Sequence, residues 1–125
     1  MYEVSIRKSF SAAHTLDIGG KCEDLHGHNF TVDITVSSQN LDSEGLVIDF
    51  RILKEWADDI LDELDHTYLN DLFHFKDINP SSESVARFIF DRTVEKVRDK
   101  NITVSKVTVW ESNTAWATYR GAESG

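Results

Sequence analysis

Residues 26–37 constrain the fold of this chain more than any other stretch, because apolar and polar side chains alternate along them. The apolar positions are Phe30, Val32, Ile34 and Val36, and β-branched residues dominate the segment. A period of two places such residues on one face of a β-strand. The same parity, extended backwards, places His26 and His28 on that face. The sequence therefore predicts a strand that carries two imidazoles on its apolar side.

Other segments predict the rest of an α+β domain. Alternation over residues 2–6 predicts the first strand, and apolar runs predict strands at residues 46–48, 107–111 and 115–120. Between them, three/four spacing predicts two amphipathic helices. The first begins at the N-cap Asp49 and ends near Asp65, and the second opens at Pro80 with Ser81 or Ser82 as its cap. The apolar face of the first helix is expected to comprise Phe50, Leu53, Ala57, Ile60, Leu61 and Leu64.

The resulting order is ββααββ, in one domain over residues 1–121 with a loose tail over residues 122–125. Two hairpins would make a four-stranded antiparallel sheet with both helices on one face. The other face and two strand edges would stay open. Joining several sheets into a barrel removes edges and buries that face, so the pattern predicts a homo-oligomer.

Composition excludes some classes of function. The formal net charge is −9, and no Lys/Arg cluster could neutralise phosphates, so nucleic acid is not an expected partner. No apolar run is long enough to span a bilayer, and the first residues lack a signal pattern. The single cysteine allows no intrachain disulfide. A cytoplasmic location is expected, with no membrane partner.

The clearest chemical motif is His26-Gly27-His28, with His14 a short way before it. Two imidazoles at i and i+2 on a strand point to the same side and can share one ion. With His14 as a third ligand, they would form a zinc site with an open position, which is the catalytic type. The alternative is that these are ordinary core or surface histidines.

Four further residues allow more than one interpretation. Cys22 could be a fourth ligand, a base beside a metal, or a residue without chemical function. Asp65 and His66 could form a proton relay, or could be polar residues that end a helix. Glu111 could be a buried carboxylate that binds N–H groups of a fused heterocycle, or a strand-end residue in solvent.

These residues together resemble the 6-pyruvoyl-tetrahydropterin synthase/6-carboxytetrahydropterin synthase family over nearly the whole chain. The matching motifs are Phe10-Ser11-Ala12-Ala13-His14, Cys22 with His26-Gly27-His28, Val47-Ile48-Asp49-Phe50, Leu64-Asp65-His66 with Tyr68-Leu69-Asn70, Pro80-Ser81-Ser82-Glu83, Glu111, and Tyr119-Arg120-Gly121. The resemblance implies the tunnelling fold: ββααββ subunits form trimers that close a β-barrel, and two trimers form a hexamer.

The resemblance also implies roles for individual residues. Zn²⁺ would be bound by His14, His26 and His28. Cys22 would be the base that removes a proton, with Asp65 and His66 as a relay. Glu111 would anchor a pterin ring, and Ser81, Ser82 and Glu83 would line its pocket.

The implied reaction converts 7,8-dihydroneopterin triphosphate to 6-carboxy-5,6,7,8-tetrahydropterin, acetaldehyde and triphosphate, on the route to 7-deazaguanine and queuosine. Glu23, directly after Cys22, departs from that pattern. A folate-related branch has a glutamate in place of the cysteine and forms 6-hydroxymethyl-dihydropterin. Because this chain carries both residues, it resembles a dual-motif branch, which implies that product as an alternative, alone or as a second activity. Glu23 could equally be a solvated loop residue. Further alternatives are a 6-pyruvoyl-tetrahydropterin synthase, a zinc-binding assembly module without catalysis, and a cysteine-centred hydrolase.

Overall fold

Two long strands, β1 (Tyr2–His14) and β4 (His26–Ser38), form the centre of the sheet in the computed structural model. The structure describes residues 1–121, except for the side chain of Cys22, so the tail expected over residues 122–125 lies outside the described residues. The strands pair antiparallel along their full lengths, from Tyr2 opposite Ser38 to His14 opposite His26. His26 and His28 thus lie on the strand that also carries Phe30 and Val32, as the alternation predicts.

The sheet has five strands in the order β5-β1-β4-β6-β7. The other strands are β6 (Thr103–Ser112), beside β4, and the two edge strands β7 (Ala115–Tyr119) and the short β5 (Thr67–Tyr68). β5 runs parallel to β1, so the sheet is mixed, and the expected four-stranded antiparallel sheet is wrong in this respect. Residues 46–48 form no strand but a bend, although an apolar run there predicted one.

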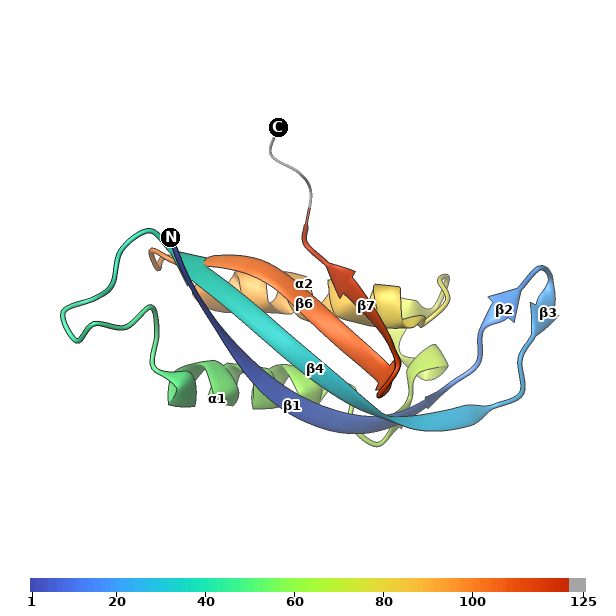
Figure 1. Ribbon diagram of the computed structural model, residues 1–125. Helices are drawn as coiled ribbons and strands as arrows, with labels where there is room; N and C mark the ends of the chain where they lie inside the picture. The colour runs from blue at the N-terminus through green and yellow to red at the C-terminus, as the bar shows by residue number, and fades with distance from the viewer. Residues whose placement is uncertain (122–125) are drawn as a thin grey trace.

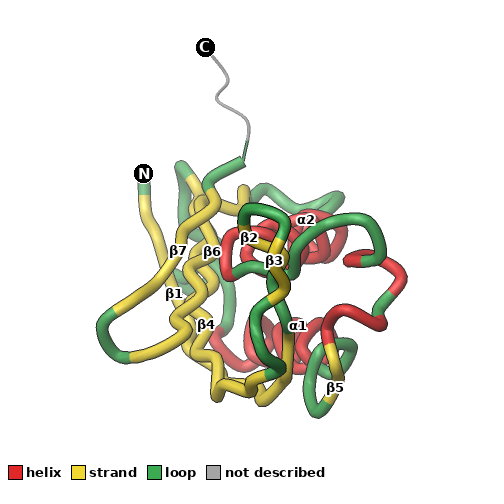
Figure 2. Tube along the Cα trace, turned by 90° about the vertical axis from the view of Figure 1, so that its right-hand side faces the viewer, coloured by secondary structure: helices red, strands yellow, loops and turns green. Residues whose placement is uncertain are grey.

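Two helices, α1 (Phe50–Leu61) and α2 (Ser82–Val97), cover one face of the sheet (Figure 2). Asp49 caps α1 by accepting a hydrogen bond from the Arg51 amide, and Ser81 caps α2 through the Ser84 amide. Short 3₁₀ helices at Leu69–Asp71 (η1) and Phe73–Phe75 (η2) lie between them in the chain. The core forms between helices and sheet, and its least exposed members include Phe30, Ile34, Leu53, Leu64 and Ile89.

The predicted helix faces need two corrections. Phe50 was expected on the buried face, but as the first residue of α1 it has 51% of its surface exposed. Val94 of α2 continues the three/four spacing of apolar residues that predicts the helix, but it is 41% exposed. Leu53, Ala57, Ile60, Leu61 and Leu64 are buried as predicted.

The sheet face away from the helices is polar. Arg7 on β1 binds Asp33 on β4 through two hydrogen bonds of 2.6 and 3.0 Å. The indole nitrogen of Trp110 also donates to Asp33, at 3.0 Å. Trp116 on the edge strand β7 packs against Trp110 with the two rings tilted by 35°, and it remains more than half exposed. This face therefore has paired charges and indoles where the opposite face has an aliphatic core.

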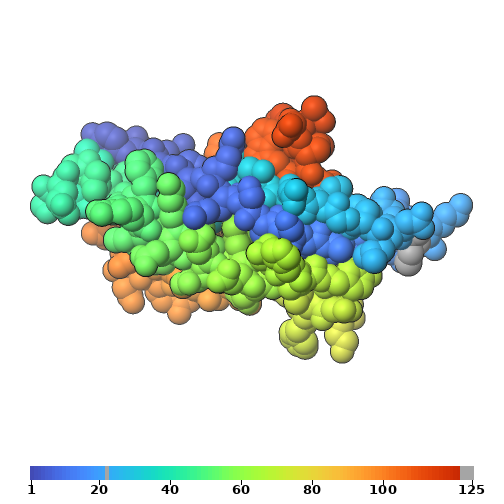
Figure 3. All heavy atoms as spheres, turned by 90° about the horizontal axis from the view of Figure 1, so that it is seen from below, coloured from blue at the N-terminus to red at the C-terminus, as the bar shows by residue number. Residues whose placement is uncertain are grey.

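A small antiparallel hairpin, β2 (Asp17–Ile18) and β3 (Lys21–Cys22), joins β1 to β4. It projects past the end of the main sheet (Figure 1, Figure 3). Gly19 and Gly20 form its tip with positive φ angles, which side chains disfavour. None of the described helices is long and apolar enough to cross a membrane.

Candidate metal centre

Three histidines and one glutamate converge where β1 ends and β4 begins. One ligand atom from each of His14, His26, His28 and Glu111 lies within 4.8 Å of all the others. His14 is the last residue of β1, His26 and His28 open β4, and Glu111 lies near the end of β6. We call these four residues the metal group. Its members come from three adjacent strands, so the sheet itself fixes their spacing.

Backbone carbonyls set the tautomers of two of these rings. His14 Nδ1 lies 2.8 Å from the Pro80 carbonyl oxygen, and His26 Nδ1 lies 2.9 Å from that of Asp24. A carbonyl can only accept, so Nδ1 of each ring carries the hydrogen and Nε2 keeps its lone pair. Metal-binding histidines are commonly oriented by such a bond.

The nitrogens that face the centre of the group fit a cation. His14 Nε2 and His28 Nε2 are buried and have no hydrogen-bond partner among the described residues. Glu111 Oε1 lies 3.4 Å from the first nitrogen and 2.8 Å from the second, without the geometry of a hydrogen bond. Buried polar atoms need a partner. A divalent ion would serve both nitrogens and the carboxylate at once, and three imidazoles are a donor set that suits zinc.

Electrostatics favour the neutral imidazole that a metal requires. Burial lowers the pKa of His28, and the positive charge that His26 or His14 would carry lowers it further. The carboxylates of Glu111 and Glu23 act in the opposite direction and raise it. Because the net pKa shift of His28 is downward, its lone pair is available near neutral pH.

Asp65 and His66 contact each other, although adjacent residues in a chain need not. His66 Nδ1 lies 2.9 Å from Asp65 Oδ2. The Ser11 amide donates to Asp65 Oδ1 at 2.8 Å, and this bond lowers the pKa of Asp65 more than the bond from His66 does. His66 has a positive φ of 58° and its own amide donates to the Ser11 carbonyl. The backbone of β1 thus holds the pair in place.

This pair lies near the metal group. His66 and His28 line the same shallow depression, together with Ser11, Gly27 and Tyr68. The side chain of His66 is 82% exposed, so its ring is accessible to a bound molecule and to solvent. The structure therefore brings Asp65, His66 and a histidine of the metal group together, as the relay interpretation requires.

The start of α2 also adjoins the group, because the Pro80 carbonyl that binds His14 directly precedes it. Ser81 is occupied as the helix cap. Ser82 is buried, and its hydroxyl has no hydrogen-bond partner among the described residues. Glu83 lies exposed in the first turn. Ser82 is thus the residue of this motif with an unused polar group.

Cys22 and Glu23 come from the hairpin. The Glu23 amide donates to the Leu16 carbonyl at 2.8 Å, which closes the base of the hairpin. The Glu23 side chain is exposed. The side chain of Cys22, predicted as a base, lies outside the described part of the chain.

Comparison with known proteins identifies the family. The family model described as 6-pyruvoyl tetrahydropterin synthase matches residues 3–122, which include the hairpin and the whole metal group. The chain belongs to the 6-pyruvoyl tetrahydropterin synthase family.

Named relatives and a solved structure agree with this family. A 6-carboxy-5,6,7,8-tetrahydropterin synthase of Bacillus subtilis is 32% identical over 133 residues, 99% of this chain and 88% of the relative. A dihydroneopterin monophosphate aldolase of Pyrococcus furiosus is 35% identical over 107 residues, 86% of this chain and 87% of the relative. The 6-pyruvoyl tetrahydropterin synthase structure of Caenorhabditis elegans matches with a TM-score of 0.81 at 28% identity, covering 98% of both chains.

Sequence reasoning missed two features of this family member's site. It did not place Glu111 in the metal group, because the residue is 83 positions after His28 in the chain and only strand pairing brings them together. It also missed the Pro80 carbonyl as the partner of His14. A backbone acceptor leaves no signature in side-chain identity.

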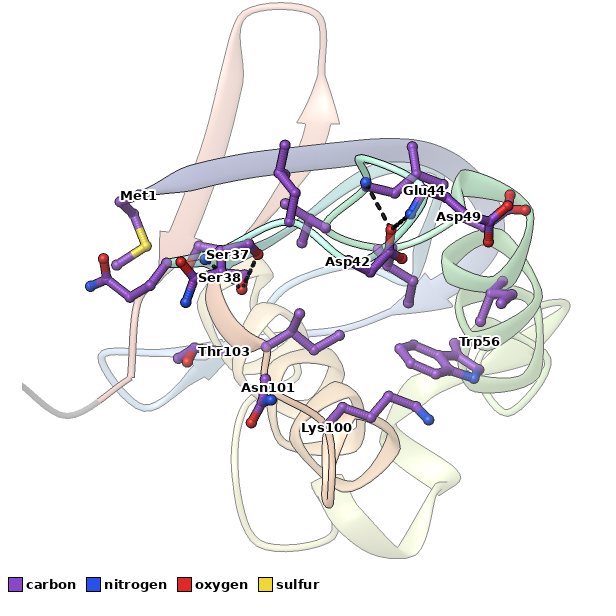
Figure 4. A pocket seen from close by; sticks show the side chains of 18 residues that line it. Met1, Ser37, Ser38, Asp42, Glu44, Asp49, Trp56, Lys100, Asn101 and Thr103 are labelled. Carbon is purple, nitrogen blue, oxygen red and sulfur yellow. Dashed lines mark hydrogen bonds between the residues drawn. The ribbon is translucent and has the colours of Figure 1, made fainter.

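A separate cavity of about 1030 Å³ lies at the opposite end of the sheet from the metal group. Figure 4 shows Asp42 and Glu44 of the loop after β4 on one side of it, and Trp56 and Lys100 on another. The carboxylate of Asp42 accepts hydrogen bonds from the Glu44 and Leu46 amides and so shapes its own loop. This cavity contains none of the predicted site residues.

Proposed function

We propose that the chain is a zinc-dependent lyase of pterin biosynthesis. In the proposed reaction, 7,8-dihydroneopterin triphosphate and water give 6-carboxy-5,6,7,8-tetrahydropterin, acetaldehyde and triphosphate, a step towards 7-deazaguanine and queuosine. The observation that supports it best is the metal group, of which His28, with its unpartnered Nε2 atom, lines the same depression as His66 of the Asp65–His66 pair. The Bacillus subtilis relative carries the name of this activity.

In this proposal, His14, His26 and His28 hold the ion with Nε2 lone pairs that the Pro80 and Asp24 carbonyls orient for two of the rings. A bound zinc ion supplies a Lewis acid that holds substrate hydroxyls and stabilises negative charge on oxygen. Because these ligands sit on paired strands, they need little rearrangement to bind it.

The proton transfers belong to the chain's own groups. Cys22 acts as the base that removes a proton from the substrate side chain, since a thiolate beside a cation has a lowered pKa. Asp65 accepts the Nδ1 hydrogen of His66 and so leaves Nε2 of that ring to accept or return a proton. In this scheme Cys22 removes the proton from the substrate, and His66 carries protons to and from it.

Recognition of the pterin ring is assigned to Glu111 and the start of α2. The Glu111 side chain is one third exposed, so its carboxylate can accept hydrogen bonds from ring N–H and amino groups. The Ser82 hydroxyl has no hydrogen-bond partner among the described residues, and Ser81 and Glu83 flank it in the chain. A carboxylate acceptor and a hydroxyl at these positions suit the N–H and amino groups of a flat heterocycle.

A second candidate function is cleavage of a dihydroneopterin phosphate side chain to give 6-hydroxymethyl-dihydropterin, alone or beside the first activity. The Pyrococcus furiosus relative is named for an aldolase acting on dihydroneopterin monophosphate. Glu23 is a carboxylate next to Cys22, and it acts on the pKa of His28 from its place on the hairpin. It is the candidate base for this route.

One incubation separates these functions. Purified protein with measured zinc content is mixed with dihydroneopterin triphosphate or monophosphate, and products are identified by mass spectrometry. Carboxytetrahydropterin supports the first function, hydroxymethyl-dihydropterin the second, and pyruvoyl-tetrahydropterin would show a 6-pyruvoyl-tetrahydropterin synthase instead. Zinc without any product would favour a non-catalytic assembly module. Cys22→Ala should keep zinc and lose carboxytetrahydropterin, whereas Glu23→Ala should lose only hydroxymethyl-dihydropterin.

We also propose that the chain assembles as a homohexamer of two trimers. β5 pairs with only Ala12 and Ala13 of β1, which leaves most of that edge open among the described strands. The outer edge of β7 is also open there. Joining β7 of one subunit to β1 of the next would remove both edges and enclose the polar sheet face.

A further inference from the structure

β1 loses its strand partners at the residue where the metal group begins. Pairing with β4 ends at His14, and pairing with β5 ends at Ala13. The chain nevertheless continues through Thr15 and Leu16 into the hairpin that carries Cys22 and Glu23. The backbone groups of this connection therefore need partners other than a neighbouring strand, such as side chains or water.

Two asparagine side chains supply those partners. The Thr15 amide donates to Asn70 Oδ1, and Asn70 Nδ2 donates to the Thr15 carbonyl, both at 2.9 Å. Asn79 makes the same two bonds with Asp17, both at 2.8 Å. Each carboxamide therefore exchanges two hydrogen bonds with one residue, as a strand does in an antiparallel ladder. We call these pairs the asparagine clamps.

The clamps act at the base of the hairpin. Asp17 is paired with Cys22 across the hairpin, so the Asn79 clamp fixes the strand opposite that residue. The Asn70 clamp holds Thr15, whose hydroxyl also lies 2.9 Å from the Tyr68 hydroxyl. Asn79 directly precedes Pro80, the residue that orients His14. One chain segment thus orients a metal ligand and anchors the hairpin.

We propose that Asn70 and Asn79 are positioning residues that hold the β2–β3 hairpin in register with the metal group. The part of this proposal that concerns catalysis rests on the proposed function, in which Cys22 or Glu23 of that hairpin is the base. The clamps themselves rest only on the hydrogen bonds. Neither asparagine is assigned to contact substrate.

Hydrogen exchange tests the clamps without any assay of activity. Asn79→Ala and Asn70→Ala should speed amide exchange at residues 15–23 at least tenfold, because each substitution removes two hydrogen bonds to the backbone of this segment. Exchange at residues 30–36 of β4 should stay unchanged. Asn101→Ala, a change to an exposed asparagine at the far end of the molecule, is the matched control and should leave both segments unaffected. Wild-type exchange in both clamp variants would overturn the proposal.

Kinetics test the positioning role. Both alanine variants should lower kcat about tenfold to hundredfold, as loss of an orienting partner does, with KM within about twofold and zinc content unchanged. Asn70→Asp should fall between wild type and Asn70→Ala, because it can still accept from the Thr15 amide but cannot donate to the carbonyl. Faster exchange with unchanged kcat would refute positioning. If wild type forms no pterin product, the proposed function fails, and the exchange data alone decide whether the clamps hold the hairpin.

Discussion

His14 illustrates how one residue can connect the core to the site. It is fully buried, and its ring packs edge-on against Phe30, His26 and His28. A buried imidazole without partners for both nitrogens would be costly. The Pro80 carbonyl satisfies Nδ1, which leaves a single lone pair directed at the metal group.

Replacing His14 should therefore separate metal binding from folding. His14→Gln removes the imidazole lone pair on Nε2 that would bind the ion, but it keeps a polar side chain that can donate a hydrogen bond to the Pro80 carbonyl. The protein should therefore fold and retain less than a tenth of its zinc. Inductively coupled plasma mass spectrometry of the dialysed protein measures this, with His74→Gln as the control outside the group. Full zinc content in His14→Gln would remove it from the ligand set.

Glu111 allows a direct test of ligand against substrate anchor. If it binds the pterin ring, Glu111→Gln should keep zinc and raise KM at least tenfold, because an amide replaces a charged acceptor. If it ligates the ion, the same change should lower zinc content instead. Metal analysis and steady-state kinetics on one preparation distinguish the two roles. A variant with wild-type zinc content and wild-type KM would exclude both.

The residue scale also shows what the sequence could reveal of the site. A His-x-His motif on an alternating strand can be recognised from the sequence, and it predicted two members of the metal group. His14 was predicted as the third from its position shortly before the motif. The Asp65–His66 pair was predicted only as a possibility, because its contact depends on the unusual φ of His66 and on the Ser11 amide. The asparagine clamps were missed, since asparagine between apolar segments usually indicates a turn.

At the scale of elements, α1 tests how far periodicity identifies a core. Leu53 is fully buried, and Phe50 one turn earlier is half exposed. Leu53→Ala should lower the free energy of unfolding by about 3 kcal/mol, through lost burial and the cavity left behind. Phe50→Ala should cost less than about 1 kcal/mol. Urea denaturation measures both, and equal losses would contradict the described packing.

The Arg7–Asp33–Trp110 network between strands predicts a pH dependence. The Arg7 hydrogen bonds, reinforced by that from Trp110, hold the pKa of Asp33 below its ordinary value. A lowered folded-state pKa adds stability above the unfolded pKa of about 4, and that stability is lost as pH falls through the folded pKa.

The matching experiment compares Asp33→Asn with wild type by urea denaturation. The variant should be about 1 kcal/mol less stable at pH 7, and the difference should shrink as the pH falls below about 4. Glu44→Gln, in an exposed loop, is the control. If the difference in the free energy of unfolding between variant and wild type stays constant with pH, the charge of the Asp33 carboxylate contributes nothing to stability.

Elements differed in how well the sequence predicted them. The long elements with a clear spacing of apolar residues were predicted correctly, because burial of one apolar face determines their structure. The short apolar run at residues 46–48 lacks a strand partner and forms a bend, whereas β5 has only two residues and forms because β1 offers an open edge. Pairing of this kind depends on tertiary position and leaves no local pattern.

At the scale of the whole molecule, the open strand edges predict assembly. Sedimentation equilibrium should give six times the chain mass of 14.2 kDa. If the two trimers separate, it should give three times the chain mass. Trp116→Lys, at an exposed position on the outer strand, should shift the mass towards the monomer, because it places a charge on an edge that must pair. A wild-type monomer at micromolar concentration would contradict the barrel.

The clamped hairpin has a consequence for how such a molecule can change its chemistry. The four residues of the metal group belong to the sheet, while the candidate bases Cys22 and Glu23 belong to a hairpin whose described side-chain clamps lie at its root. Under the proposed function, substitutions or insertions between Ile18 and Glu23 would alter the candidate bases without disturbing the strands that carry the metal group. Variation in the hairpin, at constant clamps, would then let one scaffold form different products from the same heterocycle.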